Sequence, residues 1–335
     1  MNVGPLSWIV LAVIVLFLIG LDFAGHARNP HPPSVREAMR WTIGYICLAL
    51  VFGLIVWAAS GGAYAAEFYA GWVTEWSLSV DNLFVFILIL KAFRVPREHQ
   101  QKALLFGIVI ALVLRLVFIL AGAALVERFS WIFFLFGAWL LYTAWTQATD
   151  SEDEDEDEDE YHDNAVISVI RRVLPVTDGF VGGRLLYRHG GRTHFTPLFL
   201  VIFALGTADL MFAFDSIPAI FGLTHEAYLV FACNAFALMG LRQLFFLVDG
   251  LLSKLVYLQY GLALILAFIG AKLILHAMHT NSLPFLNGGA PIEWGPEIGT
   301  ATSLIVILGV LAVTVVASLV KSRRELAPRR TDTID

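Results

Sequence analysis

Two apolar segments carry acidic residues with the same spacing. In each segment an acid is followed six positions later by an aspartate and then directly by a small polar residue. The two sets are Glu75, Asp81 and Asn82, and Asp209, Asp215 and Ser216. Carboxylate, amide and hydroxyl oxygens suit hard cations, and no His or Cys accompanies these acids, which disfavours zinc and copper. The pattern therefore predicts a site for manganese, calcium, magnesium or protons.

Further residues extend this prediction. Arg115 and Arg242 each follow an acidic pair by one apolar segment, where they either tune the site or bridge acids as structural struts. Asn234 supplies another polar side chain, for the site or for a hydrogen bond between helices. Pro218 lacks an amide N–H and so releases the carbonyl of Phe214, which predicts a helix break at the site, or a kink that serves packing alone.

Helix geometry limits how the acids can act together. Residues six apart on an α-helix are rotated by about 120° from the same face and are separated by about 9 Å along the axis. Glu75 and Asp81 therefore cannot chelate one ion from an unbroken helix. Either the helix unwinds there, or the second acid is a separate station along a path.

The elements that position these residues must be membrane helices. The 335 residues are 58% hydrophobic and only 15% charged, whereas soluble proteins are about 25% charged. Runs of about 20 apolar residues are long enough to cross a bilayer as helices. We identify nine, at 6–23, 41–59, 72–93, 103–126, 131–147, 196–222, 227–248, 257–278 and 300–320. The predicted fold is an all-α polytopic membrane protein.

Charge placement predicts the orientation. Alternate connections between the runs hold 18 of the 22 Lys and Arg residues, and cytoplasmic loops are the basic ones, so the N-terminus is expected outside and the C-terminus in the cytoplasm. Lys272 lies within a run near its expected outer end, where its long side chain can reach the interface. An ionised residue at mid-bilayer costs about 2.5–3.5 kcal/mol, so the intramembrane acids must be paired, protonated or bound to a ligand.

The repeated acidic pattern indicates an internal duplication. Each copy contains three runs, an odd number, so the second copy enters the membrane from the opposite side, and such inverted 3+3 repeats place transporter sites between the halves. We divide the chain into two N-terminal helices (1–70), a first repeat (71–148), an acidic cytoplasmic linker with an interfacial segment (149–195), a second repeat (196–278), and an outer loop with the last helix and a basic tail (279–335).

The linker and the missing motifs narrow the function. Eleven of the 28 acidic residues lie between 150 and 163, and such a block favours a solvated segment, or else a collector of cations. The residues from 165 to 195 are expected to form a short interfacial helix with Arg residues at lipid headgroups. No Walker loop, GxSxG, HExxH or nucleotide-binding motif is present, and an aspartyl protease would need a GxGD motif, so we expect no enzyme.

Several motifs together resemble the TerC family of integral membrane proteins. They are EWSLSVDNLFVF, LLFGIVIALVLR, TPLFL, DLMFAFDSIPAIFGLT, NAFALMGLRQLFFL and YGLALILAFIGAKLI, between about 71 and 278. The resemblance implies a protein of the bacterial cytoplasmic membrane, linked to tellurite resistance and manganese export, with intramembrane acids at Glu75, Asp81, Asp209 and Asp215. Many members carry another Glu where this chain has Gly206, so the second half-site has one carboxylate fewer.

The sequence and the resemblance together favour a transporter. We expect export of a divalent cation, Mn²⁺ before Ca²⁺ or Mg²⁺, with Asn82, Ser216 and Asn234 completing the site and with proton antiport as its coupling. Cation and lipid bilayer are then the partners, with no nucleic acid and no permanently bound cofactor. The alternative is a non-transporting membrane partner in envelope stress or membrane-protein insertion, which would associate with other proteins through its linker or tail.

Overall fold

The structure is a computed structural model of the chain. It describes residues 1, 3–24, 34–129, 131–149, 176–177, 179–189, 192–248, 257–280, 286–287, 290–292, 294–296 and 298–325, without the side chains of residues 81, 84, 189, 192, 248 and 323–325. The acidic block from 150 to 163 and the basic tail after 325 lie outside these residues. The expected roles of those two segments therefore stay predictions.

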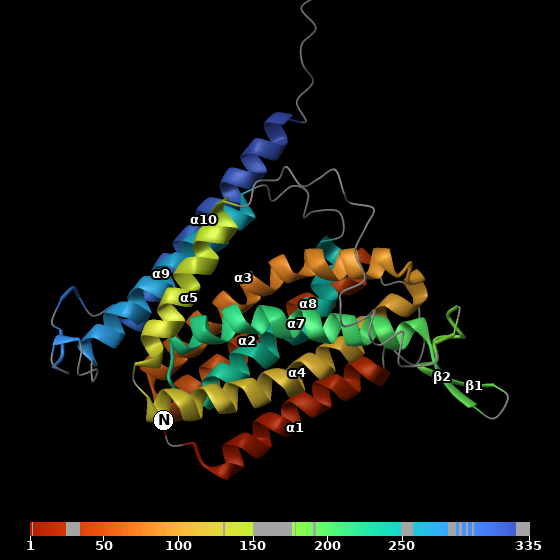
Figure 1. The fold of residues 1–335 in the computed structure, drawn as a ribbon, viewed down its shortest axis with the longest axis horizontal. Coiled ribbons are helices and arrows are strands. Elements are labelled where there is room, and N and C mark those ends of the chain that lie inside the picture. The colour runs from red at the N-terminus through yellow and green to blue at the C-terminus, as the bar shows by residue number, and fades with distance from the viewer. Residues whose placement is uncertain are drawn as a thin grey trace, which may run out of the picture.

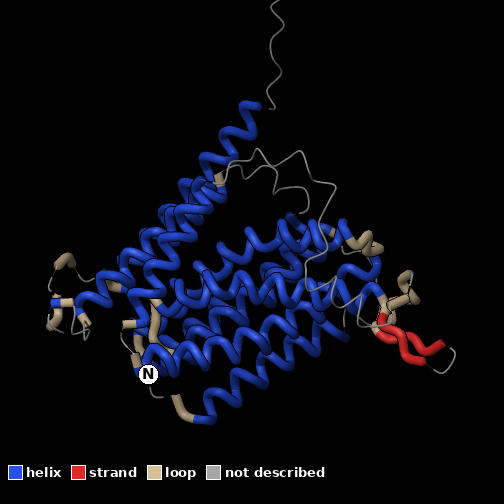
Figure 2. Tube along the Cα trace, viewed as in Figure 1, coloured by secondary structure: helices blue, strands red, loops and turns tan. Residues whose placement is uncertain are grey.

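Long α-helices make up most of the described chain, as predicted. They are α1 (Pro5–Asp22), α2 (Val35–Ser60), α3 (Gly62–Ala92), α4 (Arg97–Arg128), α5 (Ile132–Thr149), α7 (Pro197–Phe221), α8 (Ala227–Val248), α9 (Leu258–His279) and α10 (Thr300–Glu325). Two short strands, β1 (Leu186–His189) and β2 (Arg192–Phe195), form an antiparallel pair. Figure 2 shows this pair projecting from one end of the helices.

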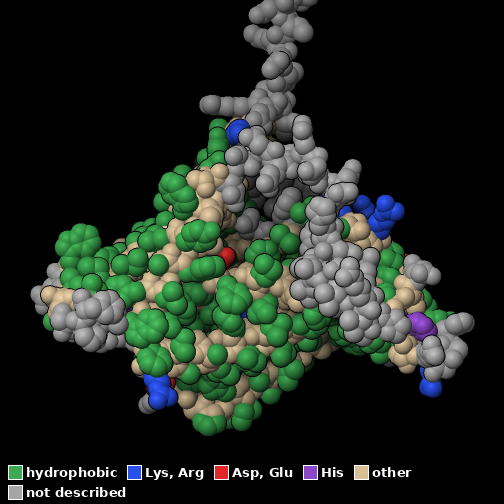
Figure 3. Space-filling view, viewed as in Figure 1, with side chains coloured by type: hydrophobic (Ala, Val, Ile, Leu, Met, Phe, Trp, Pro, Cys, Tyr) green, Lys and Arg blue, Asp and Glu red, His purple; other side chains and the backbone are tan. Residues whose placement is uncertain are grey.

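Eight of these helices are long and apolar enough to cross a membrane. The ninth predicted span is also helical, as α5, but its 18 residues include Trp, Tyr, Thr and Gln side chains that lower its hydropathy. The outer surface agrees with this assignment, because large apolar side chains such as Leu6, Ile305 and Val313 are exposed there. Figure 3 shows a face that is mostly hydrophobic, with Lys and Arg mainly towards its margins.

The helices form two groups (Figure 1). The first group contains α1, α2, α3, α4, α7 and α8, which run roughly alongside one another, and the second contains α5, α9 and α10, which run obliquely to them. Helices α5 and α9 touch along their backbones, because a Cβ added to Gly137 would lie 2.8 Å from the carbonyl oxygen of Gly270. Only glycine fits at such a distance.

The contacts between the two predicted repeats follow a regular pattern. Helix α3 packs against α8 and α4 packs against α7, and α5 packs against its counterpart α9. If α3, α4 and α5 correspond to α7, α8 and α9, exchanging the two triplets converts the α3–α8 pair into the α7–α4 pair and leaves the α5–α9 pair unchanged. The observed contacts are those expected for such a duplication. The inverted direction of the second triplet remains a prediction.

Two sequence predictions are wrong in detail. Helix α7 is not broken at Pro218 but continues through this buried residue to Phe221, because a proline removes only its own N–H bond and later turns can resume. The helix expected up to residue 195 is replaced, within its described part, by the β1–β2 hairpin, in which Tyr187 pairs with His194.

Candidate cation site

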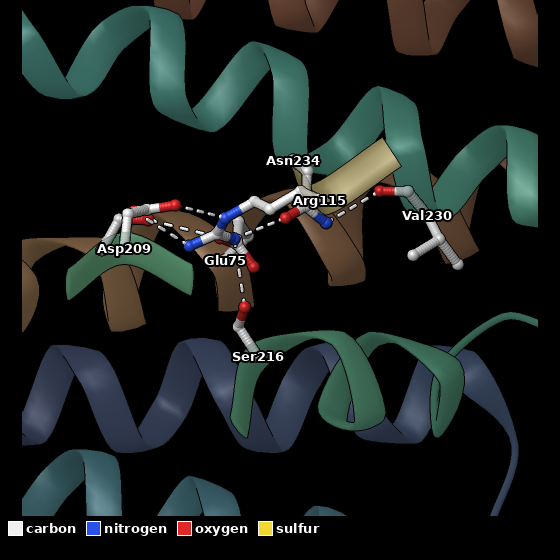
Figure 4. A network of polar contacts seen from close by, with 7 residues as sticks. Glu75, Arg115, Asp209, Ser216, Val230 and Asn234 are labelled. Carbon is white, nitrogen blue, oxygen red and sulfur yellow. Dashed lines mark hydrogen bonds and ion pairs between the residues drawn. The ribbon is translucent and has the colours of Figure 1, made fainter. Parts of the chain in front are cut away.

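The guanidinium of Arg115 is the centre of a buried polar cluster (Figure 4). Its Nε and Nη2 donate to the two oxygens of Asp209, over 2.7 and 3.1 Å. Its Nη1 forms an ion pair with Glu75 and donates to Ser216 Oγ at 3.1 Å and to Asn234 Oδ1 at 2.5 Å. One cationic side chain therefore joins two carboxylates, a hydroxyl and an amide.

Four helices from both predicted repeats supply this cluster. Glu75 lies on α3 and Arg115 on α4, whereas Asp209 and Ser216 lie on α7 and Asn234 on α8. Asp209 and Ser216 are seven positions apart, which brings them back to within about 20° of the same helix face. The side-chain amide of Asn234 is oriented by its own helix, because its Nδ2 donates a hydrogen bond to the carbonyl of Val230 at 2.9 Å. The regular geometry of α7 thus places Asp209 and Ser216 on the helix face that contacts Arg115.

The cluster is buried and carries excess negative charge. Glu75 and Arg115 are 0% exposed and Asp209 is 1% exposed. Two carboxylates face one guanidinium, and Glu75 Oε2 has no hydrogen-bond partner, while its Oε1 accepts from Ser79 at 3.4 Å and from Arg115. A buried charge without compensation is costly. The arrangement can therefore take up a proton or a cation at Glu75.

Asp215 lies apart from this cluster. It is half-buried, and its Oδ1 accepts a hydrogen bond from the indole N–H of Trp139 on α5 at 2.7 Å. The separation has a geometric cause, because α7 is unbroken and six residues rotate Asp215 by about 120° from Asp209. In this conformation Asp215 faces α5 and is not a partner of Arg115.

Asp81 and Asn82 of α3 correspond to Asp215 and Ser216 in the repeated pattern, but neither is seen to contact Arg115 in the described part of the structure. Asn82 is buried, seven positions after Glu75, and is not among the hydrogen-bond partners of Arg115. The side chain of Asp81 lies outside the described part of the structure. The helix backbone around both residues is continuous from Gly62 to Ala92, so the unwinding that we considered for α3 does not occur here.

Arg242 has a partner that sequence reasoning missed. Its Nη2 donates to Asp22 Oδ1 at 2.7 Å, and the two side chains are almost fully buried between α1 and α8. The pair therefore ties the N-terminal helix to the second repeat, away from Glu75 and Asp209. The available signal was Asp22, a carboxylate near the end of the apolar run 6–23.

Gly206 has a structural reason to lack a side chain. A Cβ at this position would lie 2.8 Å from Ile110 Cγ2 of α4. Ile110 thus occupies the space that a larger side chain at position 206 would need. Within the described residues, no group of three or more His, Cys, Asp or Glu side chains is arranged to hold a metal ion.

Comparison with known proteins shows which family the chain resembles. The model described as "Integral membrane protein TerC family" matches residues 59–326. An uncharacterized membrane protein of Mycobacterium tuberculosis is 46% identical over 96% of this chain and 81% of its own length, and one of Myxococcus xanthus is 36% identical over 96% and 94%. A protein of Escherichia coli named "Putative membrane-bound redox modulator Alx" is 33% identical over 92% and 93%. No solved structure matches the chain.

Proposed function

This chain belongs to the TerC family of integral membrane proteins, and from that premise we propose that it exports a divalent cation, Mn²⁺ first among the candidates, by alternating access. The observation that supports this most is the meeting of Glu75 and Asp209, from different repeats, around a single guanidinium with one negative charge in excess. Transporters with two repeats commonly bind their substrate at such an interface.

Arg115 serves in this proposal as a tethered cation. In the conformation described above its guanidinium occupies the centre of the oxygen donors Glu75, Asp209, Ser216 and Asn234. A divalent cation that enters takes over these oxygens, and the guanidinium moves aside. Glu75 carries a proton when the site is empty and loses it to the cation, because metal binding requires the deprotonated carboxylate. Proton antiport follows from this exchange.

The orientation of the chain in the membrane rests in this proposal on the charge pattern of the loops. Basic connections face the cytoplasm, so the N-terminus is outside, the C-terminus is inside, and the protein resides in the bacterial cytoplasmic membrane. The two triplets α3–α5 and α7–α9 are then inverted copies, and Asp81 and Asp215 are stations on either side of the central cluster. Export, rather than uptake, follows from the family resemblance.

Flux through reconstituted vesicles tests the proposal. Full-length protein in liposomes should move Mn²⁺ faster than Ca²⁺ or Mg²⁺, with opposite proton movement. Glu75→Gln and Asp209→Asn should each lower the Mn²⁺ flux at least tenfold, because each removes a carboxylate from the cluster. Glu98→Gln, on the exposed first turn of α4, is the matched control. Unchanged flux in both cluster variants would reject the site.

A second candidate follows from the names of relatives. The E. coli relative is named as a redox modulator, and this chain has two free cysteines, the exposed Cys47 and the buried Cys233. In that reading, or as a stress-response or insertion partner, the protein acts without moving an ion. A Cys47→Ser, Cys233→Ser double variant with normal Mn²⁺ flux but lost redox phenotype would favour this candidate. Loss of function on deletion of 151–160, with flux intact, would favour the protein-partner role.

A further inference from the structure

A polar cavity lies at the end of the bundle where α3 and α10 begin and α7 and α9 end. Its volume is about 350 Å³, which is within the range of small-molecule sites. The side chains that matter here are Glu67, His225, Lys272, His276, His279 and Thr300. This cavity is distinct from the central cluster, which contributes none of its lining residues.

Lys272 is the main charge in this cavity. It is half-buried, and its ammonium donates one hydrogen bond, to Ser303 Oγ at 3.1 Å. No carboxylate of the described residues lies within 4 Å of it. An ammonium has three donors, so Lys272 has unused hydrogen-bonding capacity beside open space. Glu67 of the same cavity interacts with Lys272 electrostatically without forming an ion pair. Because a half-buried ammonium is costly, a bound anion in contact with it would be stabilising.

The other cavity groups also include hydrogen-bond donors, because each imidazole carries at least one N–H. The imidazole rings of His225 and His276 lie with their centroids 5.1 Å apart. Helix α10 begins at the cavity with Gly299 and Thr300, and its first intrahelical bond is donated by Ser303 to Gly299. The N–H groups before Ser303 have no acceptor within their own helix, and the positive end of the helix dipole lies there.

Among the described lining residues, Glu67 supplies the one carboxylate, and this carboxylate already has a hydrogen-bond partner. Glu67 Oε2 accepts a hydrogen bond from Thr224 Oγ1 at 2.7 Å. A cation site would need several oxygen or nitrogen ligands around it, and the described residues form no such group. Lys272, the imidazole N–H groups and the first turn of α10 together offer more hydrogen-bond donors than the Glu67 carboxylate can accept. We propose that the cavity binds a small oxyanion through Lys272, His225 and the first turn of α10.

The pH dependence follows from the groups around His225, which lies in the loop between α7 and α8. Burial lowers the pKa of His225 below its usual value, and His276 and Lys272 lower it further, while Glu226 opposes them. Glu67 and His279 are the other titratable groups among the described residues that line the cavity. A bound anion favours the charged imidazolium and raises that pKa again. Binding therefore takes up a proton and strengthens as the pH falls.

Sulfate is a suitable probe because it keeps its charge between pH 6 and 8. Titration calorimetry with full-length protein in phosphatidylcholine nanodiscs should show sulfate binding that strengthens severalfold from pH 8 to pH 6. Lys272→Gln should weaken binding about tenfold or more, since it removes a charged donor. Glu67→Gln should strengthen binding, since it removes a like charge. Lys321→Gln, at the opposite end of α10, is the control and should bind as the wild type does.

One further variant and one change of lipid separate the outcomes. Glu75→Gln should leave sulfate binding unchanged whatever its effect on flux, so the cavity and the transport proposal can fail separately. Nanodiscs with phosphatidylglycerol distinguish the anion sources. If sulfate binds more weakly in them than in phosphatidylcholine, and Lys272→Gln shows no such difference between the two lipids, a lipid phosphate is the occupant. Equal sulfate binding in both lipids identifies a free anion. Absent sulfate binding, unchanged affinity in Lys272→Gln, or weakened affinity in Glu67→Gln would overturn the proposal.

Discussion

Replacing Arg115 by glutamine removes the only cation from the central cluster. The guanidinium makes five hydrogen bonds to Asp209, Glu75, Ser216 and Asn234, and all of these groups are buried. Breaking a buried ion pair by removing one partner costs about 3–5 kcal/mol. We therefore expect Arg115→Gln to lower the free energy of unfolding by about that amount.

A divalent cation should restore part of this loss if it occupies the space of the guanidinium. A ligand at 100 times its Kd stabilises a protein by about 2.7 kcal/mol. Wild-type protein should gain less at the same Mn²⁺ concentration, because the cation must first displace Arg115. The assay is thermal or denaturant unfolding of purified protein in lipid nanodiscs, with and without Mn²⁺, and Arg128→Gln serves as an exposed control on the same helix.

Two outcomes would refute this reasoning. If Arg115→Gln were as stable as Arg128→Gln, the ion pairs would not contribute as the burial implies. If Mn²⁺ stabilised the wild type and Arg115→Gln equally, the cation would not compete with the guanidinium. Adding Glu75→Gln to Arg115→Gln should abolish the extra Mn²⁺ effect, which assigns it to this cluster.

Three further variants test other contacts by the same unfolding measurement. Asp22→Asn should cost about 3–5 kcal/mol because it removes the carboxylate that forms an ion pair with the buried Arg242. A double variant with Arg242→Gln should be more stable than Asp22→Asn alone, and equal stability would contradict the pairing. Gly137→Ala should cost about 1–3 kcal/mol because its Cβ meets the Gly270 carbonyl, whereas Gly44→Ala, with nothing within 4 Å, should be neutral or stabilising. Gly206→Glu should be destabilising alone and be rescued by Ile110→Ala, and a failed rescue would show that Ile110 is not the obstacle.

The helices of the site could be predicted because their signals are periodic. Long apolar runs gave α3, α4, α7 and α8, and the repeated acidic pattern pointed to Glu75 and Asp209, which do converge. The same helical period explains why Asp215 is elsewhere, since seven positions, not six, return a side chain to one face. The sequence alone could therefore have predicted that Ser216, and not Asp215, lies on the same face of α7 as Asp209.

Contacts between distant helices were harder to predict. The pairing of Asp22 with Arg242 depends on how α1 packs against α8, which no local pattern encodes. The β1–β2 hairpin had a local signal that we did not use, because residues 186–189 and 192–195 are separated by Gly190 and Gly191, a pair typical of two-residue hairpin turns. The oxygen pattern alone also could not show that Arg115 fills the space between the acids.

The way Arg115 is held has a consequence for energy conservation. Because one side chain fastens α3, α4, α7 and α8 to each other, none of them can shift while the guanidinium stays bound to its acceptors. In the exchange proposed above, either a cation or a proton on Glu75 must loosen this hold before the carrier changes sides. A carrier that changed sides with neither bound would waste the proton gradient, and the buried ion pairs of Arg115 would disfavour that step.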